Sequence, residues 1–415
     1  MPAKNAQPTL PAVRDVRLLF ATRILRMFGY GLLSVVLALH LTAAGLSEAQ
    51  IGLLLTLTLM GDTAISLLIT TRADRAGRRR MLVASALLMV MAGALFASTR
   101  SFWLLLLAAT IGVISPSGNE VGPFLAVEQA ALTQAIPAER RTAVFAWYNL
   151  CASFATAFGS LVGGGLAEAL QGNGISALGS YRALACVYAA AAAVLALLFS
   201  RLSAAVETSP ANGARTVSRR SVFHLGLGSS RNKILKLAGL FSMDAFAGGF
   251  VVQAFLAYWF QQRFGVSPST LGSIFFGANI LAGVSALSAS WLAKRIGLLA
   301  TMVATHIPSN LLLVLVPLMP SLPLAIAVLL VRFSISQMDV PTRQAYTMAL
   351  APEHERAAAA GVTGIARTVG ASISPLFAGP LYASAALAAV PFYLAGGIKI
   401  AYDLLVWRAF KKVKI

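Results

Sequence analysis

The two halves of this sequence repeat each other, and the repeat constrains the fold more than any other feature. Equivalent positions lie 220 residues apart in a first block and 215 apart in a second. The first block pairs Gly29 with Gly249, Gly45 with Gly265, Gly52 with Gly272, Arg75 with Arg295 and Gly77 with Gly297, and the second pairs Gln129 with Gln344, Arg141 with Arg356 and Gly164 with Gly379. Because glycines and charges keep one register over such long stretches, we expect two similar halves.

The composition places both halves in a lipid bilayer. Of the 415 residues, 58% are hydrophobic and only 11% are charged, which is too apolar for the surface of a soluble protein of this size. A helix that spans a bilayer needs about 20 largely apolar residues, and uncharged runs of that length recur. They predict an all-α integral membrane protein of twelve transmembrane helices, six per half, which begin near residues 17, 50, 81, 102, 142, 181, 234, 270, 298, 322, 357 and 389.

Basic residues are distributed unequally between the predicted loops. Of the 33 Lys and Arg residues, 24 fall at the termini or in loops on one side, whereas only Arg100, Arg182 and Arg263 fall in loops on the other. Lys and Arg accumulate in loops that stay in the cytoplasm, so both termini are predicted to be cytoplasmic. Topology then explains the net charge of +19, and nucleic acid is not expected as a partner.

The apolar runs also give the segment boundaries. We expect a cytoplasmic N-terminal segment at 1–15, a first half at 16–200, a basic cytoplasmic linker at 201–233, a second half at 234–410 and a basic tail at 411–415. The only cysteines, Cys151 and Cys186, fall inside predicted helices. Neither a disulfide framework nor a thiolate metal site is therefore expected, and the scattered histidines suggest no metal site either.

A short basic loop between the second and third predicted helices carries a family pattern. It reads Thr71, Arg72, Ala73, Asp74, Arg75, Ala76, Gly77, Arg78, Arg79, Arg80. Together with twelve spans and a repeated half, this loop resembles the signature of the major facilitator superfamily, although Thr70 replaces the leading glycine. The resemblance implies two six-helix halves that hold a solute between them and expose it to each side of the membrane in turn.

The resemblance also implies a cytoplasmic gate. In the family, the acid of this loop meets the start of the eleventh helix, whose first turn carries a partial positive charge and unpaired N–H groups. Asp74 would then face the helix that begins near Ala357 and hold the outward-facing state. The residues expected at this gate are Asp74, Arg75, Gly77, Arg78, Arg140 and Arg141. The alternative is that Asp74 only offsets arginines that enforce topology.

Charged residues within the predicted helices are candidates for solute binding, because a charge in the bilayer is costly and usually faces a partner or a water-filled path. Counting about 1.5 Å per residue places Arg26, Asp62, Asp244, Arg332, Arg367 and Lys399 near mid-depth, with Glu120 deeper toward the cytoplasm. Helices 1, 4, 7 and 10 line the cavity of the resembled fold, which selects Arg26, Glu120, Asp244 and Arg332 and leaves Asp62, Arg367 and Tyr30 as secondary candidates. Any of these charges could instead form a static pair, such as Arg26 with Asp244.

Glu120 is the leading candidate for carrying a proton. The Gly and Pro residues around it predict a kinked fourth helix with carbonyl groups exposed to water or solute, and a carboxylate removed from water can hold a proton near neutral pH. Asp339 and Arg343, four residues apart, are predicted to form a structural or gating pair. The same spacing predicts a structural pair of Lys399 and Asp403 on a peripheral helix.

A run of small residues in the fifth helix, Gly159 to Gly165, resembles the glycine and proline motif of the family's proton-coupled exporters, with Ser160 in place of the proline. The simpler alternative is that it packs this helix against the eighth. No phosphate-binding loop or catalytic triad is present, so an enzyme is not expected. We expect a monomeric, cofactor-free secondary transporter of a bacterial inner membrane that exports a drug or other toxic small solute, a metalloid being a special case, in exchange for protons. The alternative is a proton-linked importer or exchanger of an anionic solute held by Arg26 and Arg332.

Overall fold

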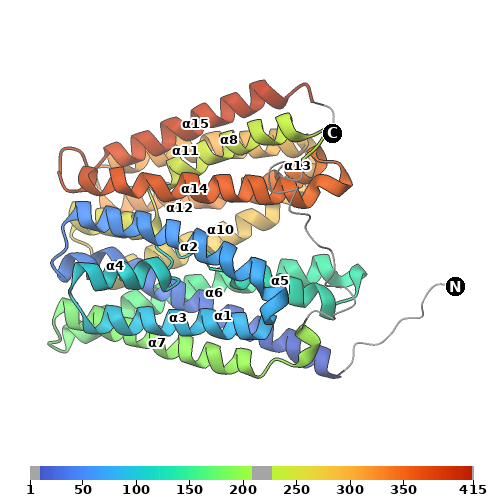
Figure 1. Cartoon of the computed structure of the whole chain (residues 1–415). Coiled ribbons are helices and arrows are strands. Elements are labelled where there is room, and N and C mark those ends of the chain that lie inside the picture. Colours follow the sequence, from blue (N-terminus) through green and yellow to red (C-terminus); the bar gives the residue numbers. More distant parts are fainter. Residues whose placement is uncertain (1–9, 121, 208–226, 414–415) are drawn as a thin grey trace.

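The computed structural model describes residues 10–120, 122–207 and 227–413, and all regular structure in these ranges is helical. The first half contains α1 (Leu10–Ala43), α2 (Glu48–Ala76), α3 (Arg78–Ser98), α4 (Phe102–Ile111), α5 (Phe124–Ala135), α6 (Ala138–Gly172), α7 (Ala177–Ser200) and the short 3-10 helix η1 (Ala204–Val206). The second half contains α8 (Arg231–Gly249), α9 (Gln253–Phe264), α10 (Pro268–Ile296), α11 (Leu298–Leu315), η3 (Val316–Leu318), α12 (Leu322–Ser336), α13 (Asp339–Leu350), η4 (Glu353–Glu355), α14 (Arg356–Tyr382) and α15 (Val390–Phe410). Figure 1 shows the two halves as parallel lobes, the first in blue to green and the second in yellow to red.

The helix boundaries follow the sequence repeat. α2 runs from Glu48 to Ala76 and α10 from Pro268 to Ile296, so both ends are 220 residues apart. α5 and α13 are likewise 215 residues apart at both ends. Each of the twelve predicted helix starts lies close to an observed one, the largest difference being residue 17 against Leu10. The additional helices α5, α9 and α13 arise because the predicted fourth, seventh and tenth helices are interrupted.

Matching caps explain why the repeated helices begin at the same positions. Ser47 accepts a hydrogen bond from the N–H of Gln50, and Ser267 accepts one from the N–H of Thr270. The turns after α2 and α10 contain Gly77 and Gly297, whose φ angles of 97° and 86° disfavour any residue with a Cβ. The repeated pair Gly77 and Gly297 therefore consists of turn residues that follow the equivalent helices α2 and α10 of the two halves.

The outer surface of the bundle is apolar. In the described residues, ten segments are long and apolar enough to cross a membrane. Large hydrophobic side chains such as Trp103, Trp147 and Trp291 are exposed, as expected for helices that face lipid. The protein is therefore a multi-pass membrane protein. The ten segments do not include α4 or α14, and a count of twelve spans stays a prediction.

The two ends of the bundle differ in charge. α1 begins and α15 ends at one end, which also holds the α2–α3 and α10–α11 turns (Figure 1). We call it the basic end, because Arg78, Arg79, Arg80, Lys294 and Arg295 lie there. The opposite end holds the α1–α2 and α9–α10 turns.

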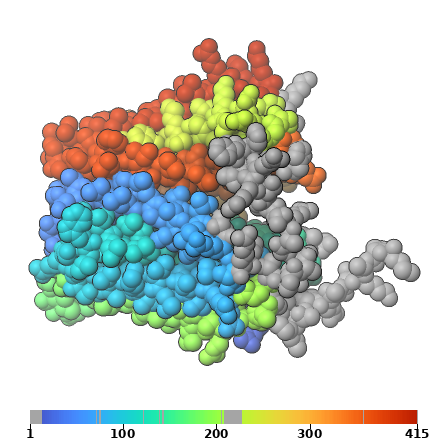
Figure 2. Space-filling model, in the orientation of Figure 1, coloured from blue at the N-terminus to red at the C-terminus, as the bar shows by residue number. Residues whose placement is uncertain are grey.

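The two halves touch closely toward the opposite end. A Cβ at Gly52 of α2 would lie 2.5 Å from the carbonyl oxygen of Pro375 in α14 and 3.1 Å from Cα of Gly379. The repeat-related crossing brings Gly272 of α10 against Gly164 of α6, where a Cβ would lie 3.1 Å from the Gly164 Cα. Figure 2 shows α2 and α14 meeting along this seam without a gap. Glycine pairs that the repeat equates therefore allow both crossings.

Hydrogen bonds between described residues of the two halves reinforce this closure. The Tyr258 hydroxyl donates to Glu48 at 2.7 Å, and the Ser269 N–H at the start of α10 donates to Glu168 of α6 at 2.9 Å. Nearer the centre, the Gln253 amide donates to the Ser34 hydroxyl at 2.8 Å. These contacts between the halves close the bundle at its opposite end. α5 and α13 pack mainly against helices of their own halves.

Candidate functional site

Interrupted helices of the two halves meet at the centre of the bundle. The described residues between α4 and α5, and those between α8 and α9, are not part of a helix. Two carbonyl groups freed by the first interruption accept hydrogen bonds from the protein and not from water or solute as predicted. The Tyr188 hydroxyl donates to the Val113 carbonyl at 2.8 Å, and the Ala254 N–H of α9 donates to the Pro116 carbonyl at 3.0 Å. The second bond joins the halves. Transporters with duplicated halves bind solutes beside such discontinuous helices.

Arg26 of α1 is the centre of a buried charge cluster in the first half. Its guanidinium donates two hydrogen bonds to the Glu128 carboxylate of α5, at 2.8 and 2.7 Å, and its Nε donates to Glu120 at 3.0 Å. The Tyr148 hydroxyl donates to Glu128 at 2.5 Å. Bidentate arginine–carboxylate pairs are strong and directional. The hydrogen bonds of the Arg26 guanidinium are therefore made to carboxylates of the protein itself.

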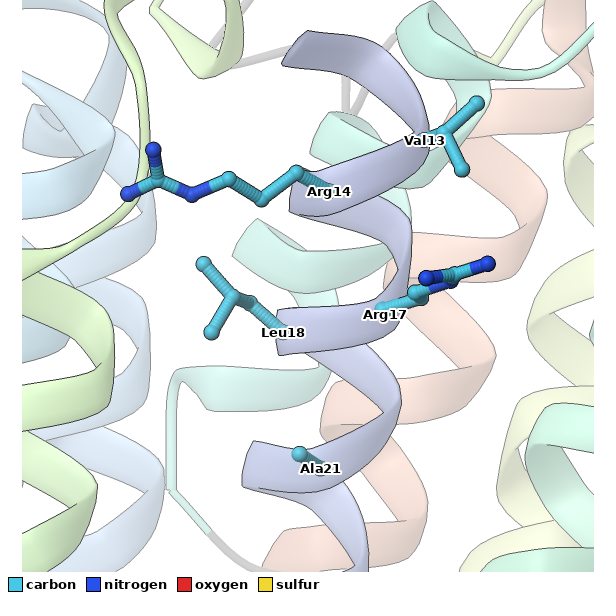
Figure 3. A pocket seen from close by; sticks show the side chains of 5 residues that line it. All are labelled: Val13, Arg14, Arg17, Leu18 and Ala21. Carbon is cyan, nitrogen blue, oxygen red and sulfur yellow. The ribbon is translucent and has the colours of Figure 1, made fainter. Parts of the chain in front are cut away.

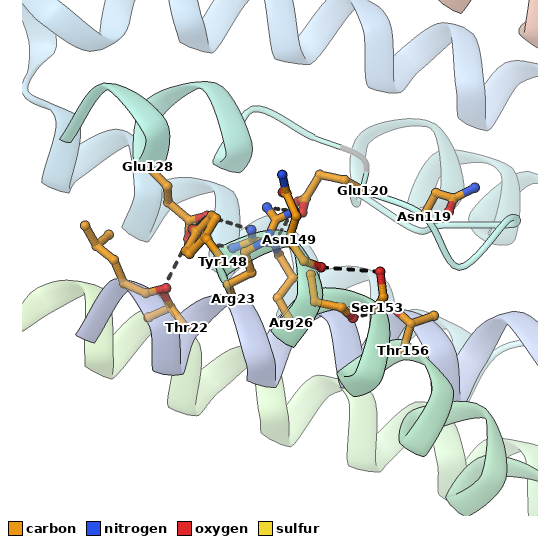
Figure 4. A network of polar contacts seen from close by, with 12 residues as sticks. Thr22, Arg23, Arg26, Asn119, Glu120, Glu128, Tyr148, Asn149, Ser153 and Thr156 are labelled. Carbon is orange, nitrogen blue, oxygen red and sulfur yellow. Dashed lines mark hydrogen bonds and ion pairs between the residues drawn. The ribbon is translucent and has the colours of Figure 1, made fainter. Parts of the chain in front are cut away.

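Arg23 extends this cluster to Asn149 of α6. Its guanidinium donates to Glu120 at 2.7 Å and to the Asn149 amide oxygen at 3.4 Å, and lies 4.5 Å from the Tyr148 ring centroid. Figure 4 shows Arg23 and Arg26 directed from α1 toward the two glutamates. The Glu120 side chain is 13% exposed and that of Glu128 is 0% exposed, so Glu120 is the carboxylate of this cluster that water or a solute can reach.

A second charge cluster lies in the other half around Asp244 of α8. Its carboxylate accepts hydrogen bonds from Lys399 of α15 at 2.5 Å and from Arg343 of α13 at 3.2 Å. Arg343 also donates to Asp339 at 2.7 Å, which is the pair that the four-residue spacing predicted. The structure thus joins a candidate solute residue, Asp244, to the predicted gating pair.

His306 of α11 connects Asp244 to a third carboxylate in this cluster. Its Nδ1 lies 2.9 Å and 3.0 Å from the two oxygens of Asp403, and its Nε2 lies 3.6 Å from Asp244. Asn310 donates to Asp403 at 3.3 Å. The predicted Lys399–Asp403 pair is therefore wrong: although both lie on α15, Lys399 bonds to α8 and Asp403 to α11, because neighbouring helices offer better-placed partners.

The two clusters occupy repeat-equivalent places with reversed charges. Glu128 and Arg343 lie 215 residues apart on α5 and α13, which are equivalent helices. Each pairs with the first helix of its own half, Glu128 with Arg26 and Arg343 with Asp244. The static pair of Arg26 with Asp244 does not form. Glu128 and His306 were not among the predicted site residues, although the register that equates Glu128 with Arg343 could have identified Glu128.

The remaining predicted residues lie outside both clusters. Arg332 of α12 is half-buried, lies 5.0 Å from the Phe333 ring centroid and makes no hydrogen bond or ion pair with a described residue. Asp62 of α2 has a buried Oδ1 atom that forms no hydrogen bond with any described residue. Tyr30 is fully buried in α1, and Arg367 is half-buried in α14. Arg332 and Arg367 are therefore the candidate cations that form no hydrogen bond or ion pair with a described residue.

The side chains of Asp74 and Arg75 lie outside the described part of the structure, so their gate stays a prediction. Of its other members, Arg140 is exposed, Arg141 donates to the Ile136 carbonyl at 3.2 Å, and the Gly77 N–H closes α2 on Ala73. The helix starts nearby are capped from within each half. Glu207 accepts the N–H of Arg78 at the start of α3 at 2.7 Å, and Glu355 accepts N–H groups just before α8.

Glu355 shows how such a cap acts on a carboxylate. The Ser230 hydroxyl and the N–H groups of Ser229 and Ser230 donate to it. These hydrogen bonds, that of the Ser230 hydroxyl first, hold the pKa of Glu355 below its usual range. The start of α8 thus receives its negatively charged partner, the Glu355 carboxylate, from η4 of the same half.

A groove of about 450 Å³ near the start of α1 is separate from these clusters. It is lined by Val13, Arg14, Arg17, Leu18 and Ala21. Figure 3 shows the two arginines pointing in different directions, and Arg14 donates to the Arg201 carbonyl at 2.8 Å. The groove therefore has no convergent pair of cations.

An apolar helical bundle with duplicated halves, central helix breaks and a charge cluster in each half defines a membrane transport protein. The family model described as Major Facilitator Superfamily matches residues 19–375 and 237–414. An uncharacterised membrane protein of Saccharomyces cerevisiae is 30% identical over 420 residues, covering 95% of this chain and 94% of that protein. The chain belongs to the Major Facilitator Superfamily. It is a secondary transporter and not an enzyme.

Solved transporters share this fold at low sequence identity. A nucleoside transporter, NupG, has a TM-score of 0.75 at 13% identity, over 96% of this chain and 100% of that one. An inward-facing, occupied bacterial homologue of the human lysosomal transporter Spinster has a TM-score of 0.74 at 16% identity, over 98% and 99%. A D-xylose–proton symporter has a TM-score of 0.68 at 16% identity, over 95% and 97%.

Proposed function

We propose that this transporter exports a small solute in exchange for protons by alternating access, with its basic end in the cytoplasm. The observation that carries the proposal is the meeting of interrupted helices from both halves between two charge clusters. Solute would bind at that meeting point, beside Glu120 and Asn149. The unequal distribution of Lys and Arg favours a cytoplasmic basic end, and the state described here would then open inward.

Export is supported by the small residues of α6. A Cβ at Gly159 or Gly163 would lie 2.0 or 2.4 Å from the carbonyl oxygens of Phe28 or Leu32 in α1, respectively. Gly164 contacts α10 in the same way, so the packing against the eighth predicted helix also occurs. This run resembles the exporter motif and brings α6 close to the helix that carries Arg23 and Arg26.

The function can be tested with a deletion strain and inverted membrane vesicles. A broad compound panel should reveal a solute to which the deletion strain is sensitised. Vesicles that are inverted and acidified inside should accumulate that solute, and an uncoupler should abolish the accumulation. Growth loss on a single nutrient, with no sensitivity, would contradict export. The placement in a bacterial inner membrane is a prediction that localisation of the native protein tests, since the relative named above comes from yeast.

An importer or exchanger of an anionic solute is the second candidate, and Arg332 favours it. Arg26 is already bound by two carboxylates, so it is not free to hold an anion as predicted. Arg332 has no such partner among the described residues. A cation without a partner near mid-depth attracts an anion strongly, because little water competes there.

We expect Arg332→Gln to weaken solute binding without destabilising the protein. Losing a charge-assisted contact should raise KM at least about tenfold, or about 1.4 kcal/mol. The melting temperature should change little, because no described residue loses a hydrogen bond or ion pair and only the contact with the Phe333 ring is lost. Initial transport rates and thermal unfolding in detergent measure the two effects. Arg263→Gln, at an exposed position of the opposite end, is the matched control. Equal KM values for the wild type and Arg332→Gln would remove Arg332 from the site.

A further inference from the structure

The two charge clusters differ in their charge balance. In the first half, two arginines face two glutamates, so the formal charges cancel. In the second cluster, the described ion pairs join three carboxylates, which are Asp244, Asp339 and Asp403, to only two permanent cations, Arg343 and Lys399. This cluster carries one surplus negative charge unless it binds one proton. A surplus charge away from water is costly. Binding one proton would remove this cost in the second cluster, whereas the first cluster is already balanced.

The geometry around His306 shows where that proton fits. The ring places Nδ1 at 2.9 Å from Asp403 and Nε2 at 3.6 Å from Asp244. A neutral imidazole has one N–H, and only the protonated ring directs an N–H to both sides. Asp403 is fully buried, and among the described residues its one other hydrogen bond comes from Asn310. The doubly protonated ring therefore completes both contacts and balances the charge.

Other ionisable groups face this site from the elements packed around α11. α15 supplies Lys399, Tyr402 and Asp403, and α8 supplies Asp244. α13 supplies Asp339 and Arg343, together with Tyr346. Arg332 is the only ionisable side chain of α12, and α10 has none before Lys294 near its end. Arg343 and Lys399 are thus engaged by Asp244 and Asp339, and Arg332 acts on Asp339 without forming an ion pair with a described residue of the cluster.

We propose that the His306–Asp403 pair carries the exchangeable proton of the transport cycle. This role depends on the proposed function, because the pair would couple solute export to proton movement. The proton would enter beside Lys399, whose side chain at 11% is more exposed than those of His306 at 7% and Asp403 at 0%. When the proton leaves, Asp403 loses its ionic partner and the Lys399–Asp244 bond becomes the main link between α15 and α8. Proton loss would thereby change how three helices of the second half hold together.

The test counts protons taken up by the purified full-length protein. Acid is added in a weakly buffered detergent solution between about pH 8 and pH 5, the range in which an ordinary histidine changes charge. Asp403→Asn removes the surplus charge, so we expect this variant to take up one proton fewer than the wild type. Asp15→Asn is the matched control, because Asp15 is also buried but is bonded to Ser203 outside the cluster. Its uptake should equal that of the wild type. Equal uptake by Asp403→Asn and the wild type would overturn the proposal.

A transport measurement separates this proposal from the function on which it rests. In vesicles, the wild type should accumulate its solute only with a pH gradient, whereas Asp403→Asn and His306→Gln should only equilibrate it. Gradient-driven accumulation that persists in both variants would overturn the role of the pair and leave proton-coupled export intact. Accumulation by the wild type that ignores the gradient would instead overturn proton coupling itself. A fluorescence size-exclusion profile equal to that of the wild type shows that each variant is folded.

Discussion

Replacing Gly52 and Gly272 together by alanine should prevent the opposite end from closing and reduce transport at least about thirtyfold. Both Cβ atoms would meet backbone of the other half, at 2.5 Å from the Pro375 oxygen and 2.7 Å from the Ser160 oxygen. Backbone cannot move aside as a flexible side chain can. Overpacking costs roughly 1–3 kcal/mol per site, and about 2 kcal/mol changes an equilibrium about thirtyfold. Initial transport rates in vesicles measure the loss.

The control for this variant lies one residue from the crossing. A Cβ at Gly165 of α6 would meet nothing within 4 Å, so Gly165→Ala changes the same stretch without touching the other half. It should transport at the wild-type rate. If the double variant matched Gly165→Ala, the glycine crossings would not be the contacts that close the opposite end.

Replacing Arg26 by alanine should cause the largest loss of stability of any single substitution in the first half. The change leaves Glu128 buried without its two-pronged partner and removes one of the two cations that hold Glu120. Removing one member of a buried ion pair typically costs about 3–5 kcal/mol, because the other charge stays unpaired. Thermal unfolding in detergent, followed by aggregation or by tryptophan fluorescence, measures the shift.

A double variant distinguishes an unpaired charge from a lost volume. Arg26→Met combined with Glu128→Met removes both charges while Arg23 still pairs with Glu120, so it should recover much of the stability that Arg26→Ala loses. Arg17→Ala on the same helix, at an exposed position, is the matched control and should have little effect. A melting temperature for Arg26→Ala as high as that of Arg17→Ala would show that the cluster is not an important source of stability.

Much of the architecture could be predicted because it depends on periodic features of the sequence. The 220-residue register predicted the equivalence of α2 with α10, and their matching serine caps and turn glycines explain it. The apolar runs gave the helix starts. The break after α4 could be anticipated from Gly118, Gly122 and Pro123, although the use of the Pro116 carbonyl by the other half could not, because it depends on the docked arrangement.

The partners of the buried charges could not be predicted, because each pairs across helices far apart in the sequence. Depth alone placed Arg26, Asp244 and Lys399 at similar levels and gave no means to choose among partners. The four-residue spacing within a helix correctly predicted the pair of Arg343 with Asp339. The same spacing wrongly predicted a pair of Lys399 with Asp403. The difference is physical: Arg343 reaches both Asp339 and Asp244, whereas Lys399 is directed to α8 and Asp403 to α11.

Distances between spin labels at both ends of the bundle test alternating access most directly. One pair, at Ala49 and Ala385, reports on the opposite end, and a second, at Gln134 and Ala349, reports on the exposed ends of α5 and α13; Cys151 and Cys186 are first replaced. Two lobes that rock about the central site predict a second population when pH or solute is varied, with the first distance longer and the second shorter. A single unchanging distance for both pairs, or two distances that lengthen together, would contradict a transporter that works by alternating access.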